Sequence, residues 1–354
     1  MKRAKASILN STGDLQLTTI RAWAAAGPKE PFKPFEYELG ALGPDEIDID
    51  VDYCGLCHSD LSMWANEWGR TAYPFVGGHE VVGRVREVGA NVAGLTVGQK
   101  VGLGWLSKSN LNSQQSLSGD HNLSPGNEAT IIGRHGGFAD IVRCQWVWAI
   151  PLPEDVDFKK AGPLFCGGVT VFNPLVQFSV KPTDKVGVIG IGGLGHLGLQ
   201  FLNKWGCEVT AFTSSPDKEK EAREFGAHKT LNSRDPGAWK QAKGRFDFLL
   251  ATVAVTLDWT RLMRTLAPRG RLHFVGAVGE PVPVHIPAIM GGQNQISASP
   301  VGSPAVTAQM LDFCSRHDIA PMTEQFKMSD INAAMEHLDA GKARYRIVLE
   351  NDFD

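Results

Sequence analysis

The sequence lacks the features that mark membrane, nucleic-acid-binding and disulfide-stabilised proteins. No apolar run reaches the roughly 18 residues that a membrane span requires. The formal net charge is only −3 at pH 7, which argues against nucleic acid or an anionic membrane as the main partner. The six cysteines are scattered over 354 residues and do not form a disulfide framework, so reduced thiols in the cytoplasm are expected.

Other absences concern targeting and repetition. Residues 1–5 are basic, but no apolar signal core follows them, so export is not expected. No internal repeat or low-complexity tract occurs. Hydrophobic residues make up 43% of the chain and charged residues 21%, which is typical of a globular protein. A chain of this length can form two domains, each with its own core.

The hydrophobic pattern changes near Pro151. Before it the chain is predicted to be β-rich, with strands at 46–53, 81–89, 97–103 and 138–142. A polar segment from Trp105 to Arg134 has no clear period, and loops of that length are usually functional. After Pro151, strands alternate with helices, which predicts a doubly wound parallel sheet. Its expected strands are 186–189, 208–213, 246–250 and 271–276, followed by helices at 305–316 and 329–340 and a last strand at 344–350.

A glycine-rich turn follows the strand at 186–189. Gly190 permits a tight turn, Gly192 lets the backbone approach a pyrophosphate, and Gly195 lets helix and strand pack closely. The helix that follows offers free N–H groups to phosphates. Such a motif is often only a loop, but its place between a strand and a helix favours dinucleotide binding. The expected phosphate-binding residues are Gly190, Gly192, Gly193, Leu194 and Gly195.

The residues after the second strand indicate which dinucleotide is bound. An acidic residue there would bind the ribose 2′-hydroxyl of NAD. The chain instead has Ser214, Ser215 and Lys218, and two hydroxyls with a lysine suit the 2′-phosphate of NADP. The alternative is that these residues form a helix cap and a solvated lysine, as in most Ser-Ser-Pro turns.

Three short runs contain candidate metal ligands: Cys57-His58-Ser59-Asp60, Gly78-His79-Glu80 and Cys166. Two thiolates and one imidazole leave a tetrahedral zinc ion with an open fourth position, which is the arrangement of catalytic sites. Each signal alone is weak, since a lone cysteine is usually a small buried hydrophobe. Their order, beside glycine-rich strands or turns and upstream of a dinucleotide fold, favours a metal site.

The chain resembles the zinc-dependent medium-chain dehydrogenases, in particular the branch of cinnamyl alcohol dehydrogenases and broad bacterial aldehyde reductases. The runs that carry the resemblance are 54–60, 77–83, 134–139, 161–170 and 344–346. The resemblance implies an α/β protein with a GroES-like β-rich catalytic domain and a Rossmann cofactor domain. The expected boundaries are 1–166 for the catalytic domain, to which 305–354 return, and 167–304 for the NADP-binding domain.

The resemblance also implies roles for single residues. Cys57, His79 and Cys166 would bind zinc, whereas Cys54 would be a core residue. Glu80 would be a nearby carboxylate that can visit the metal, and Asp60 would orient His79, as partners of ligating histidines do. The cofactor site would also include Thr170 and Arg346.

The same resemblance implies a proton relay. Ser59 would hydrogen-bond the substrate oxygen and pass on its proton. In many relatives a histidine three residues later ends the relay at solvent, but this chain has Ser62 there. The relay would therefore stop at ribose and water, or use His58.

A second zinc site of the family is expected to be absent. Relatives commonly hold a structural zinc on four cysteines, and this chain has Asn110, Ser113, Ser116 and Ser124 at that spacing. Neutral amides and hydroxyls are poor zinc ligands compared with thiolates. One catalytic zinc per chain is therefore predicted, with this segment held by side chains that hydrogen-bond their own backbone.

The sequence thus predicts a zinc enzyme that interconverts aldehydes and primary alcohols by hydride transfer with NADP(H), chiefly as a broad aldehyde reductase. Aromatic and medium aliphatic substrates are favoured because four large side chains lie near the metal motifs in the sequence, although each could be a core residue: Met63, Trp64, Trp68 and Trp105. The expected partners are a small-molecule aldehyde or alcohol and a second copy of the chain, since the family commonly dimerises through its cofactor domains.

Two alternatives stay open. One is a zinc-independent quinone or enoyl reductase of the same superfold, which should lack the set of Cys57, His79 and Cys166. The other is a catalytically silent NADPH-binding protein with a purely structural zinc, against which the intact Ser59, Asp60 and Glu80 argue.

Overall fold

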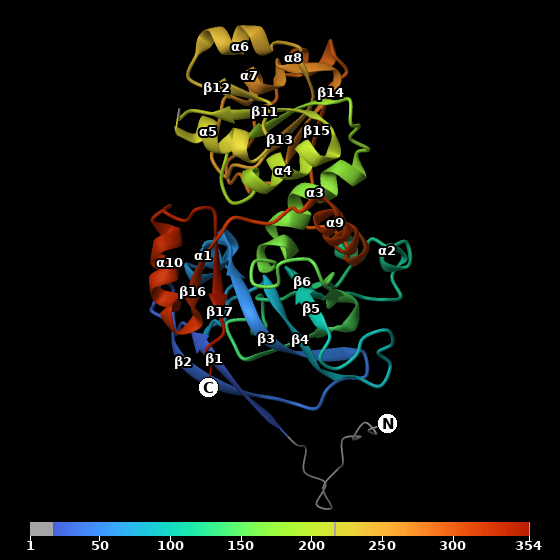
Figure 1. Cartoon of the computed structure of the whole chain (residues 1–354), viewed down its shortest axis with the longest axis vertical. Helices are drawn as coiled ribbons and strands as arrows, with labels where there is room; N and C mark the ends of the chain where they lie inside the picture. The colour runs from blue at the N-terminus through green and yellow to red at the C-terminus, as the bar shows by residue number, and fades with distance from the viewer. Residues whose placement is uncertain (1–16, 216, 354) are drawn as a thin grey trace, which may run out of the picture.

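The computed structural model describes residues 17–215 and 217–353. The basic residues 1–5, on which the export prediction depends, lie outside this range, as does Pro216. The chain forms two lobes, each built on its own sheet, with the six-stranded sheet at the top of Figure 1. Among the described residues, no helix has both the length and the apolar character needed to cross a membrane.

The upper lobe is a parallel sheet with the strand order β12-β11-β10-β13-β14-β15. The order reverses beside β10, and ligands of such sheets bind at the carboxyl ends of the strands at that point. The strands are β10 (Lys185–Ile189), β11 (Glu208–Thr213), β12 (Lys229–Asn232), β13 (Phe246–Ala251), β14 (Leu266–Phe274) and β15 (Gln295–Ala298). Its helices are α4 (Gly195–Trp205), α5 (Asp217–Glu224), α6 (Pro236–Ala242), α7 (Trp259–Met263) and α8 (Ile286–Met290). The prediction of a doubly wound parallel sheet is confirmed.

The lower lobe is built on a seven-stranded sheet with the order β16-β17-β3-β4-β5-β9, and β8 pairs with β3. These strands are β3 (Glu46–Leu56), β4 (Val81–Val88), β5 (Lys100–Leu103), β8 (Ile141–Gln145), β9 (Ile150–Pro151), β16 (Thr323–Lys327) and β17 (Arg346–Glu350). The blue and red ends of the chain meet here, because β17 runs antiparallel to β3 (Figure 1). The β-rich lobe made from both ends of the chain is the GroES-like part of the predicted fold.

The remaining elements cover and connect the sheets. Strands β1 (Thr18–Ala24) and β2 (Lys33–Leu39) form a hairpin of their own. The helices are α1 (His58–Trp64), α3 (Gly167–Gln177), α9 (Pro304–His317) and α10 (Ile331–Asp339), with 3₁₀ turns η2 (Trp146–Trp148), η3 (Gly162–Phe165) and η4 (Met328–Asp330). Helix α3 packs on α4, which belongs to the predicted cofactor domain, and on α9, which lies beyond its predicted end. The boundaries at 166 and 304 therefore stay a prediction.

Three predicted strands begin later than the sequence pattern indicates, as does the helix predicted from residue 329, which begins at Ile331. The strand expected from Phe138 begins at Ile141, because Phe138 donates its backbone N–H to Gly77 O at 3.0 Å instead of joining a strand. The strand expected from residue 97 begins at Lys100, after a turn at Gly98 with φ of +86°. The last strand begins at Arg346 instead of residue 344.

The segment from Trp105 to Arg134, predicted as a long loop, contains four short elements. They are β6 (Leu106–Lys108), α2 (Gln114–Leu117), the 3₁₀ turn η1 (His121–Leu123) and β7 (Glu128–Ala129). Ser113 caps α2, since its Oγ accepts the backbone N–H of Ser116 at 3.1 Å. The same Oγ lies 3.1 Å from Ser116 Oγ and 2.8 Å from Ser124 Oγ. The expectation that side chains of this segment bond their own backbone is confirmed.

Candidate functional site

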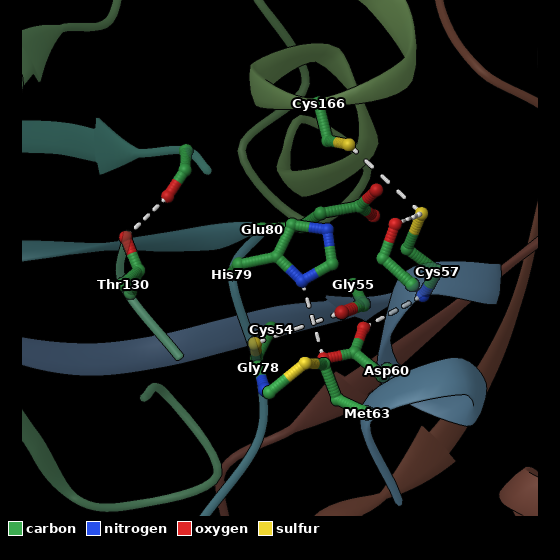
Figure 2. A network of polar contacts seen from close by, with 12 residues as sticks. Cys54, Gly55, Cys57, Asp60, Met63, Gly78, His79, Glu80, Thr130 and Cys166 are labelled. Atoms are coloured by element: carbon green, nitrogen blue, oxygen red, sulfur yellow. Dashed lines mark hydrogen bonds and ion pairs between the residues drawn. The ribbon is translucent and has the colours of Figure 1, made fainter. Parts of the chain in front are cut away.

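Four potential metal ligands meet between the lobes. One donor atom from each of Cys57, His79, Glu80 and Cys166 lies within 4.8 Å of all the others. Figure 2 shows these side chains gathered at one place. Cys57 precedes α1, His79 and Glu80 precede β4, and Cys166 precedes α3. The two sulfur atoms are 3.9 Å apart. A tetrahedral zinc ion with bonds of about 2.3 Å would hold two sulfurs about 3.8 Å apart, so the spacing fits.

The imidazole of His79 is fully buried and oriented by one partner. Its Nδ1 lies 3.2 Å from Asp60 Oδ1. Its Nε2 is buried without a hydrogen-bond partner and points to the side where Cys57 and Cys166 lie (Figure 2). A buried polar atom without a partner costs free energy, so this nitrogen fits a group that is bound to metal.

Asp60 holds the cluster together. Its Oδ1 also accepts the backbone N–H of Gly78 at 2.9 Å, and its Oδ2 accepts that of Cys57 at 3.0 Å. The carboxylate is fully buried. One side chain therefore fixes the backbone on both sides of the cluster as well as the ring of His79.

The electrostatics of the cluster favour a thiolate at Cys57 but not at Cys166, whose pKa is raised by its hydrogen bond with Cys57 and by burial. The hydrogen bond from Cys166 lowers the pKa of Cys57 well below its ordinary value, although burial opposes the shift. Burial acts to lower the pKa of His79, but the Asp60 carboxylate outweighs it and raises that pKa. A thiol that loses its proton readily is what metal binding requires.

Glu80 is fully buried beside the cluster and pairs with Arg346. Arg346 Nη2 donates to Glu80 Oε1, while Glu80 Oε2 has no hydrogen-bond partner. Burial raises the pKa of Glu80 to about 7, against the opposing attraction of Arg346. A Cβ at Gly55 would lie 2.1 Å from Glu80 Oε2, so only glycine leaves room for this carboxylate.

Of the predicted relay residues, Ser59 faces the cluster. Its Oγ lies 3.8 Å from Cys57 Sγ, and the residue is half-buried. The neighbouring His58 is exposed. Ser62 is buried and donates its hydroxyl to Glu67 Oε2 at 2.7 Å, away from the relay.

The glycine turn has the geometry of a phosphate-binding loop. Gly190 has a φ of +93°, and a Cβ at Gly195 would lie 2.0 Å from Gly190 O. A Cβ at Gly193 would lie 2.9 Å from Arg346 Nη1, so Arg346 lies between Glu80 and this turn. Leu194 precedes α4, and Thr170 lies one turn into α3, whose first residue packs beside Leu194.

A cavity of about 380 Å³ lies at the ends of β10, β11 and β13. Ser214 and Lys218 line it, together with Trp239 and Arg261 on the side of α6 and α7. Lys218 Nζ donates to Ile191 O in the glycine turn at 3.2 Å. Ser215 lies beside the cavity and donates its backbone N–H to Thr213 Oγ1 at 3.1 Å.

Of the four large side chains near the metal motifs in the sequence, two also lie beside the cluster in space. Trp105 meets the His79 ring edge-on at 5.0 Å, and Trp68 meets Trp105 at 5.9 Å. Met63 instead belongs to the core, and Trp64 stacks on Phe32 at 6.3 Å. Both follow from helical geometry, because successive residues of α1 point to different sides.

Comparison with known proteins shows where the chain belongs. The alcohol dehydrogenase GroES-like domain family matches residues 43–154, and the zinc-binding dehydrogenase family matches residues 193–316. The aldehyde reductase AdhA from Synechocystis sp. is 54% identical over 332 residues, which cover 94% of this chain and 99% of the relative.

Solved structures give the same result. A cinnamyl alcohol dehydrogenase from Sorghum bicolor matches with a TM-score of 0.89 and 33% identity, over 94% of this chain and 98% of that one. The CAD from Helicobacter pylori, solved in complex with NADP(H), matches with a TM-score of 0.86 and 27% identity, over 95% of this chain and 99% of that one. The chain belongs to the zinc-binding medium-chain alcohol dehydrogenases, in the branch that contains cinnamyl alcohol dehydrogenases and aldehyde reductases.

Proposed function

We propose that the protein interconverts aldehydes and primary alcohols with NADP(H) and one zinc ion per chain, mainly as an aldehyde reductase. The observation that carries the proposal is the unpartnered Nε2 of His79, beside two sulfur atoms that are 3.9 Å apart. Cys57, His79 and Cys166 would hold the zinc, and Glu80 would be the nearby carboxylate that can reach it. The 54% identity to an aldehyde reductase supports this direction.

When bound, the zinc supplies polarisation of the substrate oxygen, and the nicotinamide donates or accepts the hydride. Asp60 keeps the ring of His79 in the orientation that presents Nε2 to the metal side. Ser59 Oγ hydrogen-bonds the substrate oxygen and passes a proton to it or from it. The exposed imidazole of His58, on the adjacent residue, offers a route to solvent that does not require Ser62.

The cavity beside the glycine turn is the proposed nucleotide site. The glycine turn (Gly190, Gly192, Gly193, Leu194 and Gly195) would hold the pyrophosphate, with Arg346 and Thr170 on its other side. Ser214 and Lys218 line the cavity and, with Ser215, would bind the 2′-phosphate. The NADP(H) complex of the Helicobacter pylori relative supports this choice of cofactor.

The indole rings of Trp68 and Trp105 favour aromatic and medium aliphatic aldehydes. Trp105 packs against a proposed ligand, and 41% of Trp68 is exposed. An aromatic substrate gains stacking contacts in such a pocket that a short aliphatic one does not.

We also propose a homodimer through the cofactor lobes. Strand β15 ends the strand order of the six-stranded sheet, and α8 beside it carries the exposed side chains of Ile286 and Met290. Sedimentation at micromolar concentration tests this proposal, and a monomer would contradict it. A cytoplasmic location is proposed on the six free cysteines, which suit a reducing compartment.

Three measurements test the function. Elemental analysis should find one zinc per chain, and two would contradict the proposed zinc content. A panel of benzaldehyde-type and aliphatic aldehydes, assayed with NADPH and NADH, should show reduction with a preference for NADPH of at least tenfold, the expected value of a charge-assisted contact. Ser214→Asp should erase or reverse that preference.

The same assays separate the alternatives. A quinone or enoyl reductase would turn over quinones or enones after chelation of zinc. A silent binding protein would bind NADPH and oxidise it with none of the aldehydes. Equal efficiency with both cofactors would reject the proposed 2′-phosphate site.

A further inference from the structure

Tyr345 joins the two lobes. Only 5% of its surface is exposed, and it directly precedes Arg346 at the start of β17. Its ring stacks on that of His196, with centroids 5.2 Å apart, and meets Phe225 edge-on at 5.1 Å. His196 lies in the first turn of α4, and Phe225 follows α5. The residue therefore connects the last strand of the catalytic lobe to two helices of the cofactor lobe.

The hydroxyl of Tyr345 is bonded to helix α5. It donates to Glu221 Oε2, and Arg344 Nη1 lies 3.5 Å from the same oxygen. Glu221 stands three residues after Lys218, on the same face of the helix. A residue of the catalytic lobe thus holds the helix that carries the proposed ligand of the 2′-phosphate.

The ring of Tyr345 also supports the glycine turn. His196 Nδ1 lies 3.1 Å from Gly192 O, and its Nε2 accepts the backbone N–H of Met322 at 3.3 Å. Burial lowers the pKa of His196 to about 3, so the ring is neutral, with Nδ1 donating and Nε2 accepting. Tyr345 stacks on this imidazole with an angle of 16° between the rings. The turn and α5 are therefore held by the same side chain.

The bond between Tyr345 and Glu221 matters because the Glu221 carboxylate could otherwise pair with Lys218. Acidic and basic side chains three residues apart on a helix pair with each other. A released Glu221 would turn toward Lys218 and compete with a phosphate for its ammonium group. The carboxylate is instead held by Tyr345 and Arg344 and faces those two residues.

We propose that Tyr345 is a positioning residue for cofactor choice: its hydroxyl holds Glu221 away from Lys218, which keeps Lys218 available for the 2′-phosphate of NADP(H). This inference rests on the proposed function, since it assumes that Lys218 binds that phosphate. It adds a residue from outside the nucleotide cavity to the set that distinguishes NADPH from NADH.

The variant Tyr345→Phe tests the inference, because it removes the hydroxyl and keeps the stacked ring. Titration by NADPH fluorescence should show a Kd about tenfold higher for NADPH, and the corresponding titration with NADH should show little change, which lowers the preference by the same factor. Tyr73→Phe is the matched control. Its hydroxyl donates to Trp64 O at 2.9 Å within the catalytic lobe, so its loss should leave the preference unchanged. A merely structural role would lower the unfolding temperature of both variants and leave both preferences intact.

Two further results test whether Tyr345 acts on the NADPH preference through Lys218. In a Lys218→Ala background, Tyr345→Phe should lower the preference no further, and an additional loss there would overturn the proposed route through Lys218. A wild-type preference for NADPH that survives Tyr345→Phe overturns this inference alone. A wild-type protein that binds both cofactors equally overturns the proposed cofactor and the inference together.

Discussion

Two clusters of the catalytic lobe differ in how their donor atoms are satisfied. In the metal cluster, defined as Cys57, His79, Glu80 and Cys166, the atoms His79 Nε2 and Glu80 Oε2 are buried without partners. In the serine cluster, defined as Asn110, Ser113, Ser116 and Ser124, Ser113 Oγ bonds the hydroxyls of both other serines, and Ser124 Oγ lies 3.3 Å from Asn110 O.

The difference shows what a metal contributes to each part of the lobe. Unpartnered buried atoms destabilise a fold unless a ligand completes them, so the metal cluster is complete only with its ion. The serine cluster is complete as folded. Four predictions test this contrast, and they are ordered from the largest expected effect to the smallest.

Removal of one ligand from the metal cluster should have the largest effect. Cys57→Ala should lose the zinc, and aldehyde reduction should fall by roughly 10³-fold or more, because polarisation of the substrate oxygen is worth several kcal/mol. Zinc analysis and steady-state rates measure both. Cys54→Ala is the control, since Cys54 is buried three residues away but is not among the four clustered ligands. If Cys54→Ala also loses the zinc, the assignment of Cys57 is wrong.

Loss of the hydroxyl next to the metal cluster should slow the reaction and leave the fold intact. Ser59→Ala should reduce the rate by about 10²–10⁴-fold, the range for a positioned proton-transfer group. Zinc content and unfolding temperature should stay at their wild-type values. Nearly full activity in this variant would reject Ser59 as the relay.

Cysteine at the four positions of the serine cluster should convert it into a second metal site. The variant with cysteine at positions 110, 113, 116 and 124 together should contain two zinc ions per chain, because four thiolates form a closed structural site. Its unfolding temperature should then fall on addition of chelator, whereas the wild-type segment should be insensitive. A zinc content that stays at one would mean that the backbone of this segment cannot bring the four sulfurs together.

Loss of one hydroxyl from the serine cluster should have the smallest effect on activity. Ser113→Ala removes the cap of α2 and leaves Ser124 without its closest partner, which should lower the free energy of unfolding by about 2 kcal/mol. Denaturant unfolding measures the loss, and kcat should stay unchanged. A change in kcat without a change in stability would reverse the roles assigned to the two clusters.

The contrast also shows how far the sequence predicts this molecule. Four strands of the six-stranded sheet contain apolar runs and the metal motifs lie beside glycines, so these can be located from the pattern. The short strands β12 and β15 have no such run and were not predicted. The serine cluster was predicted as a segment without zinc that is held by its own side chains. Its short elements were not predicted, because they have no period and depend on a bond between Ser113 and Ser124.

Contacts between distant residues are harder to predict. Glu80 and Arg346 are 266 residues apart, and no local pattern pairs them. The roles of His196 and Tyr345 were not predicted for the same reason, although each stands next to a recognisable motif. Met63 and Trp64 show the limit of closeness in sequence, since Met63 is fully buried in the core beside Asp60 and Trp64 stacks on Phe32.

The antiparallel pairing of β17 with β3 has a consequence for how the enzyme is made. Ile347 lies opposite Leu56, and Arg346 completes the surroundings of Glu80. The six-stranded sheet ends at Ala298 and can fold while the ribosome is still adding residues. Strand β17, in contrast, is synthesised after that whole sheet, so Arg346 can reach Glu80 only later. The surroundings of Glu80 are therefore complete only after β17 has been made, and not after synthesis of Cys57, His79 and Cys166 alone.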